Sequence, residues 1–178
     1  MCASLRRKNI IRVIIANDHP LIRDGFKKLL TTEDDISLVG EAKNGAEVLS
    51  LINETSPDVL VLDIGLPDKN GLDILEEIQT LGLHIGILVL SMYPERRFAK
   101  RALTSGAAGY LTKDTALEEL VGAIRKIYSS GHYMTGRLAE LIAEDCQQNS
   151  GGEPHETLSH REYQIFISIA EGKTIKEI

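Results

Sequence analysis

Three largely apolar runs rich in Val, Ile and Leu constrain the fold of this chain more than any other feature. They occupy residues 10–16, 58–64 and 85–91 and read IIRVIIA, DVLVLDI and IGILVLS. Runs of this length and composition are typical of strands buried on both faces, as in a parallel sheet. Two weaker segments, 36–42 and 109–112, have a similar character.

Stretches with helical spacing follow each of these runs. They cover residues 19–32, 45–54, 71–81, 94–105 and 116–128. Strand and helix thus alternate five times, which predicts an α/β fold, a doubly wound domain with a five-stranded parallel sheet, over residues 10–130. Ligands in this fold class bind beyond the carboxyl ends of the strands.

Polar residues stand at four of the predicted strand ends. Asn17 and Asp18 follow the first strand, Asp63 closes the third, Ser91 closes the fourth, and Lys113 follows the fifth. The two carboxylates offer oxygen ligands to a hard divalent cation, with Mg²⁺ preferred because it takes few protein ligands. Asp63 is then a candidate nucleophile toward phosphorus, with Lys113 and Ser91 near the phosphoryl oxygens. Each residue alone is an ordinary loop residue, but their joint placement favours a site.

The motifs that contain these residues resemble the receiver domain of two-component response regulators. They are Asn17-Asp18-His19-Pro20, Asp63 to Pro67 with Gly71, Leu90-Ser91-Met92, and Gly106 to Lys113. The His-Pro pair and Leu-Ser-His-Arg-Glu at residues 158–162 are similar to the NarL/FixJ subfamily, whose effector is a LuxR-type helix-turn-helix. The resemblance runs from about residue 10 to the last residue and implies a flavodoxin-like fold.

The resemblance implies a phosphoacceptor and a metal site. Asp63 would receive a phosphoryl group from the phosphohistidine of a sensor histidine kinase. Asp18, Asp63 and the backbone carbonyl of Gly65 would bind Mg²⁺. Asn17 stands where the family usually has an acidic residue, so we expect it to meet the ion through water and to weaken metal binding without abolishing it.

The resemblance also implies a switch. Ser91 would turn toward the phosphate, Lys113 would pair with it, and Tyr110 would change rotamer with Ser91. Without the resemblance, an aromatic residue on a strand, such as Tyr110, is as often a packed core residue as a functional switch. Phosphorylation would promote homodimerisation and, in the intact family member, transcription control. For His19 we expect no chemistry, because with no second His or Cys nearby it caps or packs the start of the first helix.

The last part of the chain is predicted to differ from the receiver. Residues 131–157 have the composition of a linker with a helix at 136–146, and residues 158–178 match the start of a helix-turn-helix. The third helix of that unit, which enters the major groove, would lie beyond Ile178. We therefore expect this chain not to bind DNA specifically.

Composition limits the location and the class of protein. The net charge is −6, and the two cysteines have neither metal-site nor disulfide spacing, which favours a reducing cytoplasm. The first apolar run is too short and too charged for a secretory signal, and no membrane segment is predicted. We expect no enzyme activity beyond limited autophosphorylation and autodephosphorylation.

Two other functions are weighed against this one. A phosphohydrolase resembling the haloacid dehalogenase family needs a second aspartate two residues after the nucleophile, and Gly65 stands there. A phosphorylation-independent or dominant-negative receiver module, acting by protein–protein pairing, fits the neutral Asn17 and the incomplete helix-turn-helix.

Overall fold

A computed structural model describes residues 10–93 and 95–140, and its elements lie in a compact unit that ends at Ala139. The strands are β1 (Ile11–Ala16), β2 (Ile36–Ala42), β3 (Val59–Asp63), β4 (Gly86–Ser91) and β5 (Gly109–Thr112). The helices are α1 (Pro20–Thr31), α2 (Gly45–Thr55), α3 (Gly71–Thr80), α4 (Glu95–Thr104) and α5 (Ala116–Ser130). The predicted alternation is confirmed, and the largest boundary difference is the end of α5, at residue 130 instead of 128.

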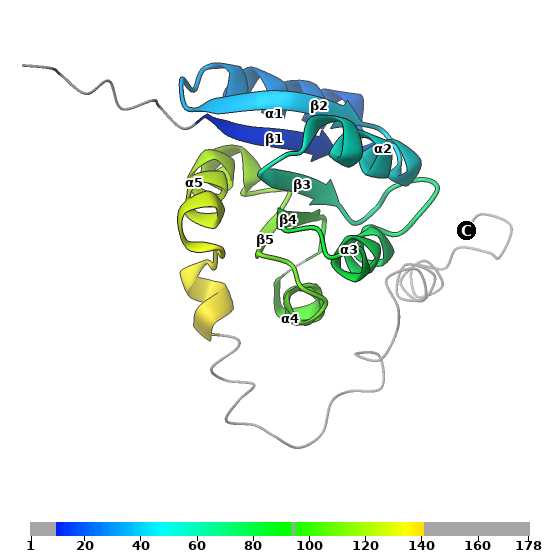
Figure 1. The fold of residues 1–178 in the computed structure, drawn as a ribbon. Helices are drawn as coiled ribbons and strands as arrows, with labels where there is room; N and C mark the ends of the chain where they lie inside the picture. The colour runs from blue at the N-terminus through cyan, green and yellow to red at the C-terminus, as the bar shows by residue number, and fades with distance from the viewer. Residues whose placement is uncertain (1–9, 94, 141–178) are drawn as a thin grey trace, which may run out of the picture. The chain divides into compact units, whose positions relative to one another are not determined.

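The five strands form one parallel sheet in the order β2-β1-β3-β4-β5 (Figure 1). The prediction of a doubly wound, flavodoxin-like α/β fold is therefore confirmed. The strand order reverses between β1 and β3, and the connections that leave these two strands go to opposite faces of the sheet. In such folds the crevice at this switch point is the usual ligand site.

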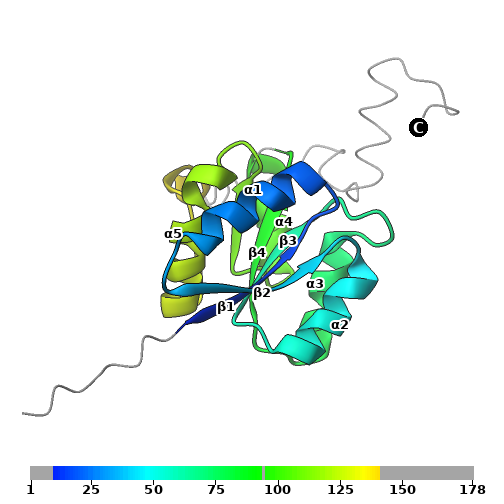
Figure 2. The ribbon, with the colours of Figure 1, turned by 90° about the horizontal axis from the view of Figure 1, so that it is seen from above.

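Helices cover both faces of the sheet. Helices α1 and α5 lie together on one face, and α2 and α3 lie on the other (Figure 2). Strand residues alternate between the two faces, so Val13 and Ile15 pack under α1 and α5 while Ile14 faces the opposite side. Both faces are covered, which explains why β3 and β4 are apolar up to their last residues and why β1 is apolar apart from Arg12.

The chain continues to pack on the α/β unit after α5. The backbone N–H of Tyr133 donates to the carbonyl of Ala108 at 2.7 Å, and the Tyr133 hydroxyl donates to Glu119 at 2.5 Å. Leu138 is buried, and residues 136–140 are helical. The rest of the predicted linker helix and the predicted helix-turn-helix, residues 158–178, lie outside the described residues.

No helix within the described part of the chain is both long enough and apolar enough to cross a bilayer.

Candidate functional site

Asp63 is the last residue of the central strand β3, and its carboxylate is buried. The Nζ atom of Lys113 donates to Asp63 Oδ2 at 2.5 Å, and the side chains of this pair are 6% and 3% exposed. The backbone N–H of Gly65 donates to the other oxygen, Oδ1, at 3.0 Å. Each carboxylate oxygen therefore has a donor, and a charge-assisted bond fixes the side chain at the strand end.

The loop after Asp63 is held close to the strand by Gly71, the first residue of α3. The N–H of Gly71 donates to the carbonyl of Ile64 at 2.9 Å. A Cβ atom at position 71 would lie 2.5 Å from the carbonyl oxygen of Asp63 and 2.8 Å from the Cα of Ile64. Gly71 belongs to the motif quoted from the sequence, and the physical reason for glycine there is this close approach of two backbone segments.

Asp18 lies beside Asp63 at the switch point between β1 and β3. One ligand atom each from Asp18, His19 and Asp63 lie within 4.8 Å of one another. Two carboxylate oxygens this close to each other form the kind of hard donor set that Mg²⁺ prefers, so these residues fit the ion that the family implies. Gly65 lies in the same loop as Asp63, and the use of its carbonyl as a ligand stays a prediction.

His19 was predicted to cap or pack the start of α1. His19 occupies the position before the helix, but its side chain makes no capping hydrogen bond. Its Nδ1 lies 2.5 Å from Asp18 Oδ1, and its side chain is 60% exposed. Sequence reasoning considered only a nearby His or Cys as a second ligand for this histidine, and Asp63 is distant from it in the chain.

Asn17 is fully buried and orients the turn between β1 and α1. Its Oδ1 accepts the backbone N–H of His19 at 2.8 Å, and its own N–H donates to the carbonyl of Ala42 at 3.1 Å. The Asn17 Nδ2 atom has no hydrogen-bond partner among the described residues. A buried amide donor without a partner is energetically costly, so Asn17 is held here by its other hydrogen bonds.

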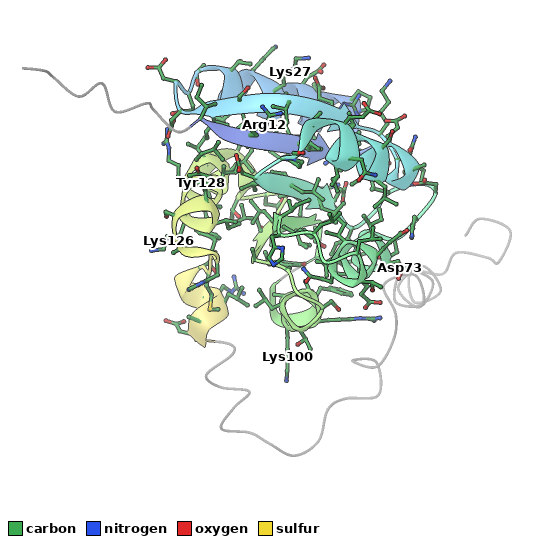
Figure 3. All side chains as sticks on the ribbon, viewed as in Figure 1. Arg12, Lys27, Asp73, Lys100, Lys126 and Tyr128 are labelled. Carbon is green, nitrogen blue, oxygen red and sulfur yellow. The ribbon has the colours of Figure 1, made fainter. Side chains whose placement is uncertain are left out.

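Arg23 supports this turn, and sequence reasoning missed it. Its Nη1 donates to the carbonyl of Asn17 at 2.7 Å, and the residue is only 8% exposed. Glu41 lies 3.6 Å from Arg23 Nε and also accepts from Lys27, which lies at the surface (Figure 3). The hydrogen bond to Glu41 raises the pKa of Lys27. The sequence signal that could have identified Arg23 is its spacing of three residues from Phe26, which puts both on the buried face of α1.

The two predicted switch residues contact the same backbone segment. Ser91 is buried, and its Oγ accepts the backbone N–H of Tyr93 at 3.0 Å. The hydroxyl of Tyr110, a fully buried residue on β5, donates to the carbonyl of the same Tyr93 at 2.9 Å. The carbonyl of Ser91 accepts the N–H of Lys113 at 2.8 Å. Ser91, Tyr110 and Lys113 thus lie in one connected network next to Asp63.

Asp68 fixes the loop between Asp63 and α3 to the start of α2. Its Oδ1 accepts from the N–H of Gly45 at 2.7 Å, and its Oδ2 accepts from the N–H of Ala46 at 3.1 Å. The hydrogen bond from Gly45 is the main cause that lowers the pKa of Asp68 below its ordinary value of 3.8. Asp68 therefore acts as a helix cap that comes from a distant part of the chain.

We expect Asp68→Ala to lower the free energy of unfolding by about 1 kcal/mol at pH 7, because two N–H groups of α2 lose their acceptor. Since the folded pKa is depressed, this contribution is complete above pH 3.8 and is lost as the pH falls through the folded value. Urea unfolding at pH 7 and pH 3 measures the difference. Asp24→Ala, an exposed position on α1, is the control, and equal losses in the two variants would contradict the cap.

Comparison with known proteins agrees with this geometry. The family model described as the response regulator receiver domain matches residues 13–125. Response regulator GacA of Pseudomonas aeruginosa is 32% identical over 170 residues, which cover 95% of this chain and 79% of that protein. Response regulator UvrY of Escherichia coli K12 is 31% identical over 170 residues, which cover 95% of this chain and 78% of UvrY.

A solved structure gives the same result. A two-component response regulator of the LuxR family from Aurantimonas sp. SI85-9A1 has a TM-score of 0.71 and 33% identity, and the match covers 78% of this chain and 99% of that one. The chain therefore belongs to the response regulator receiver family. Its similarity to GacA, to UvrY and to the LuxR-family structure makes it a NarL/FixJ-type response regulator of a two-component system.

Proposed function

We propose that Asp63 is the phosphoacceptor of this response regulator and that a sensor histidine kinase supplies the phosphoryl group. The observation that carries the proposal is the buried ion pair between Asp63 and Lys113 at the carboxyl end of β3. This pair holds a carboxylate at the switch point of the sheet, beside the carboxylate of Asp18. A carboxylate in such a place is a suitable nucleophile toward phosphorus.

In the proposed reaction, an oxygen of Asp63 forms a bond to phosphorus while the bond between phosphorus and the imidazole nitrogen of the kinase breaks. Asp63 carries a negative charge before the transfer, so no proton has to leave it. Lys113 is placed to neutralise the added phosphoryl oxygens. Asp18 and Asp63 would hold Mg²⁺, which supplies positive charge to the transferring phosphoryl group.

The consequences of phosphorylation are proposed to pass through Ser91. Its hydroxyl oxygen accepts the N–H of Tyr93, and after phosphorylation the hydroxyl would instead donate to a phosphoryl oxygen. The hydrogen bond from the Tyr110 hydroxyl to the carbonyl of Tyr93 would change with it. Homodimerisation and transcription control through a LuxR-type helix-turn-helix would follow in the intact protein. The cytoplasmic location predicted from composition belongs to this proposal as well.

Intact-protein mass spectrometry after incubation with Mg²⁺ and acetyl phosphate tests the phosphoacceptor. We expect a single phosphoryl adduct that requires the metal and is absent from Asp63→Asn. Asp73→Asn, which changes an exposed aspartate in the first turn of α3, is the matched control and should keep the adduct. An adduct on Asp63→Asn, or none on the unaltered chain with Mg²⁺, would refute the proposal.

We expect Asn17→Asp to strengthen Mg²⁺ binding, because it adds a carboxylate beside Asp18 and Asp63. The buried Arg23 next to position 17 favours this added charge. Calorimetric titration with Mg²⁺ compares the two chains, and coinciding affinities would show that the amide is equivalent to a carboxylate here.

A further inference from the structure

The chain reverses direction after α5 and returns to β5. Gly131, directly after the helix, has a φ of 83°, so the helix ends in a left-handed turn. Two residues later, the N–H of Tyr133 donates to the carbonyl of Ala108, directly before β5, at 2.7 Å. Leu138, further along, is buried. Residues 131–139 belong to the same compact unit as the sheet, and we call them the strap.

Tyr133 contacts both ends of β5. Its backbone binds the carbonyl before the strand, and its hydroxyl donates at 2.5 Å to Glu119, in the first turn of the helix after the strand. The ring packs against the hydrophobic core that contains Leu111 of β5 and Leu120 of α5. A Cβ atom at Gly109 would lie 3.0 Å from the carbonyl oxygen of Tyr133 and 3.2 Å from its Cβ. The strap therefore lies directly on the strand.

The opposite side of β5 carries the predicted switch residue. Neighbouring residues of a strand point to opposite faces, so Tyr110 points away from the strap that contacts Gly109. The hydroxyl of Tyr110 donates to the carbonyl of Tyr93 at 2.9 Å. Among the described strands, β5 lies at the edge of the sheet and pairs with β4 alone. A four-residue edge strand has only one neighbouring strand to hold it, so the contacts on its two faces fix its position together.

We propose that the strap holds β5 in the arrangement in which Tyr110 binds Tyr93, and that phosphorylation of Asp63 loosens the strap. The inference rests on the proposed function, in which the bond from Tyr110 to Tyr93 changes after phosphorylation. A change at Tyr110 shifts β5, and the carbonyl of Ala108, which binds Tyr133, shifts with it. Since such coupling is reciprocal, release of Tyr133 also favours the phosphorylated arrangement. The strap thus connects the switch to the part of the chain beyond it.

Amide hydrogen exchange followed by NMR tests the strap, because the N–H of Tyr133 is protected by its hydrogen bond to Ala108. With Mg²⁺ and acetyl phosphate, we expect this amide to exchange at least about 5-fold faster in the unaltered chain and at an unchanged rate in Asp63→Asn. Mass spectrometry of the same samples measures the phosphoryl adduct. An adduct on the unaltered chain without faster exchange at Tyr133 would overturn the strap and leave the phosphoacceptor intact.

A double-variant cycle tests the same connection without phosphorylation, so it decides the role of the strap when no adduct forms and the phosphoacceptor is refuted. Tyr110→Phe and Tyr133→Phe each remove one hydroxyl and keep the ring. If both hydroxyls hold β5, urea unfolding of the double variant should show a smaller loss of stability than the sum of the two single losses. Tyr128→Phe, at a tyrosine of α5 that is 40% exposed, is the matched control and should be additive with Tyr110→Phe (Figure 3). Additive losses in both pairs would overturn the proposal.

Discussion

Gly71→Ala should destabilise this protein by about 3 kcal/mol, near the upper end of what overpacking usually costs. The added methyl group would lie 2.5 Å from the carbonyl oxygen of Asp63 and 2.8 Å from the Cα of Ile64, and neither is the end of a flexible side chain. The backbone must move to relieve this contact. Because the moving segment carries Asp63, we expect phosphorylation by acetyl phosphate to slow as well.

Thermal or urea unfolding measures the first effect, and the rate of adduct formation measures the second. Gly122→Ala is the matched control, because a Cβ atom there meets nothing within 4 Å and lies inside helix α5. Alanine is the better helix former, so this control should stabilise the protein by about 0.5–1 kcal/mol. If the two variants shift stability in the same direction, the close approach at Gly71 is not a constraint.

Lys113→Met should also have a large effect, a loss of about 3 kcal/mol at pH 7. The substitution leaves the Asp63 carboxylate 3% exposed and without its counter-charge, with Asp18 in the same cluster. Removing one partner of a buried pair is costly because the remaining charge stays desolvated. We expect Mg²⁺ to restore part of the lost stability, since an ion bound to the carboxylates replaces the missing positive charge.

A double variant separates this explanation from simple loss of packing. Asp63→Asn combined with Lys113→Met removes both charges and should recover most of the stability in urea unfolding. Lys126→Met, at an exposed lysine on α5, serves as the control and should have little effect (Figure 3). A double variant as unstable as Lys113→Met alone would show that the pair is not the cause.

The sequence predicted the fold well because its strongest signals are local. Apolar runs and helical spacing identify elements one at a time, and the turns between them contain Gly, Pro and Asn. The rule for parallel sheets then predicts that Asp18, Asp63 and Lys113 meet at one edge. The structure brings these three side chains together, while their roles in phosphoryl transfer remain predictions.

The supporting contacts were harder to predict because they join distant segments through side-chain geometry. Asp68 resembles any loop aspartate until its two oxygens are seen on the backbone of α2. Arg23 reads as a solvated cation, yet it is buried between Glu41 and the carbonyl of Asn17. For His19, the helix start was predicted correctly, but the direction of the ring depended on Asp18.

Tyr93 binds both predicted switch residues through its main chain. Ser91 accepts from its N–H and Tyr110 donates to its carbonyl, so side chains from β4 and β5 both bind the main chain of this one residue. Neither bond depends on the side chain at position 93, and only proline would remove the donor. The side chain at position 93, whose ring centroid lies 5.1 Å from that of Phe98 of α4, can therefore be exchanged and its packing against α4 altered while both hydrogen bonds to the main chain persist.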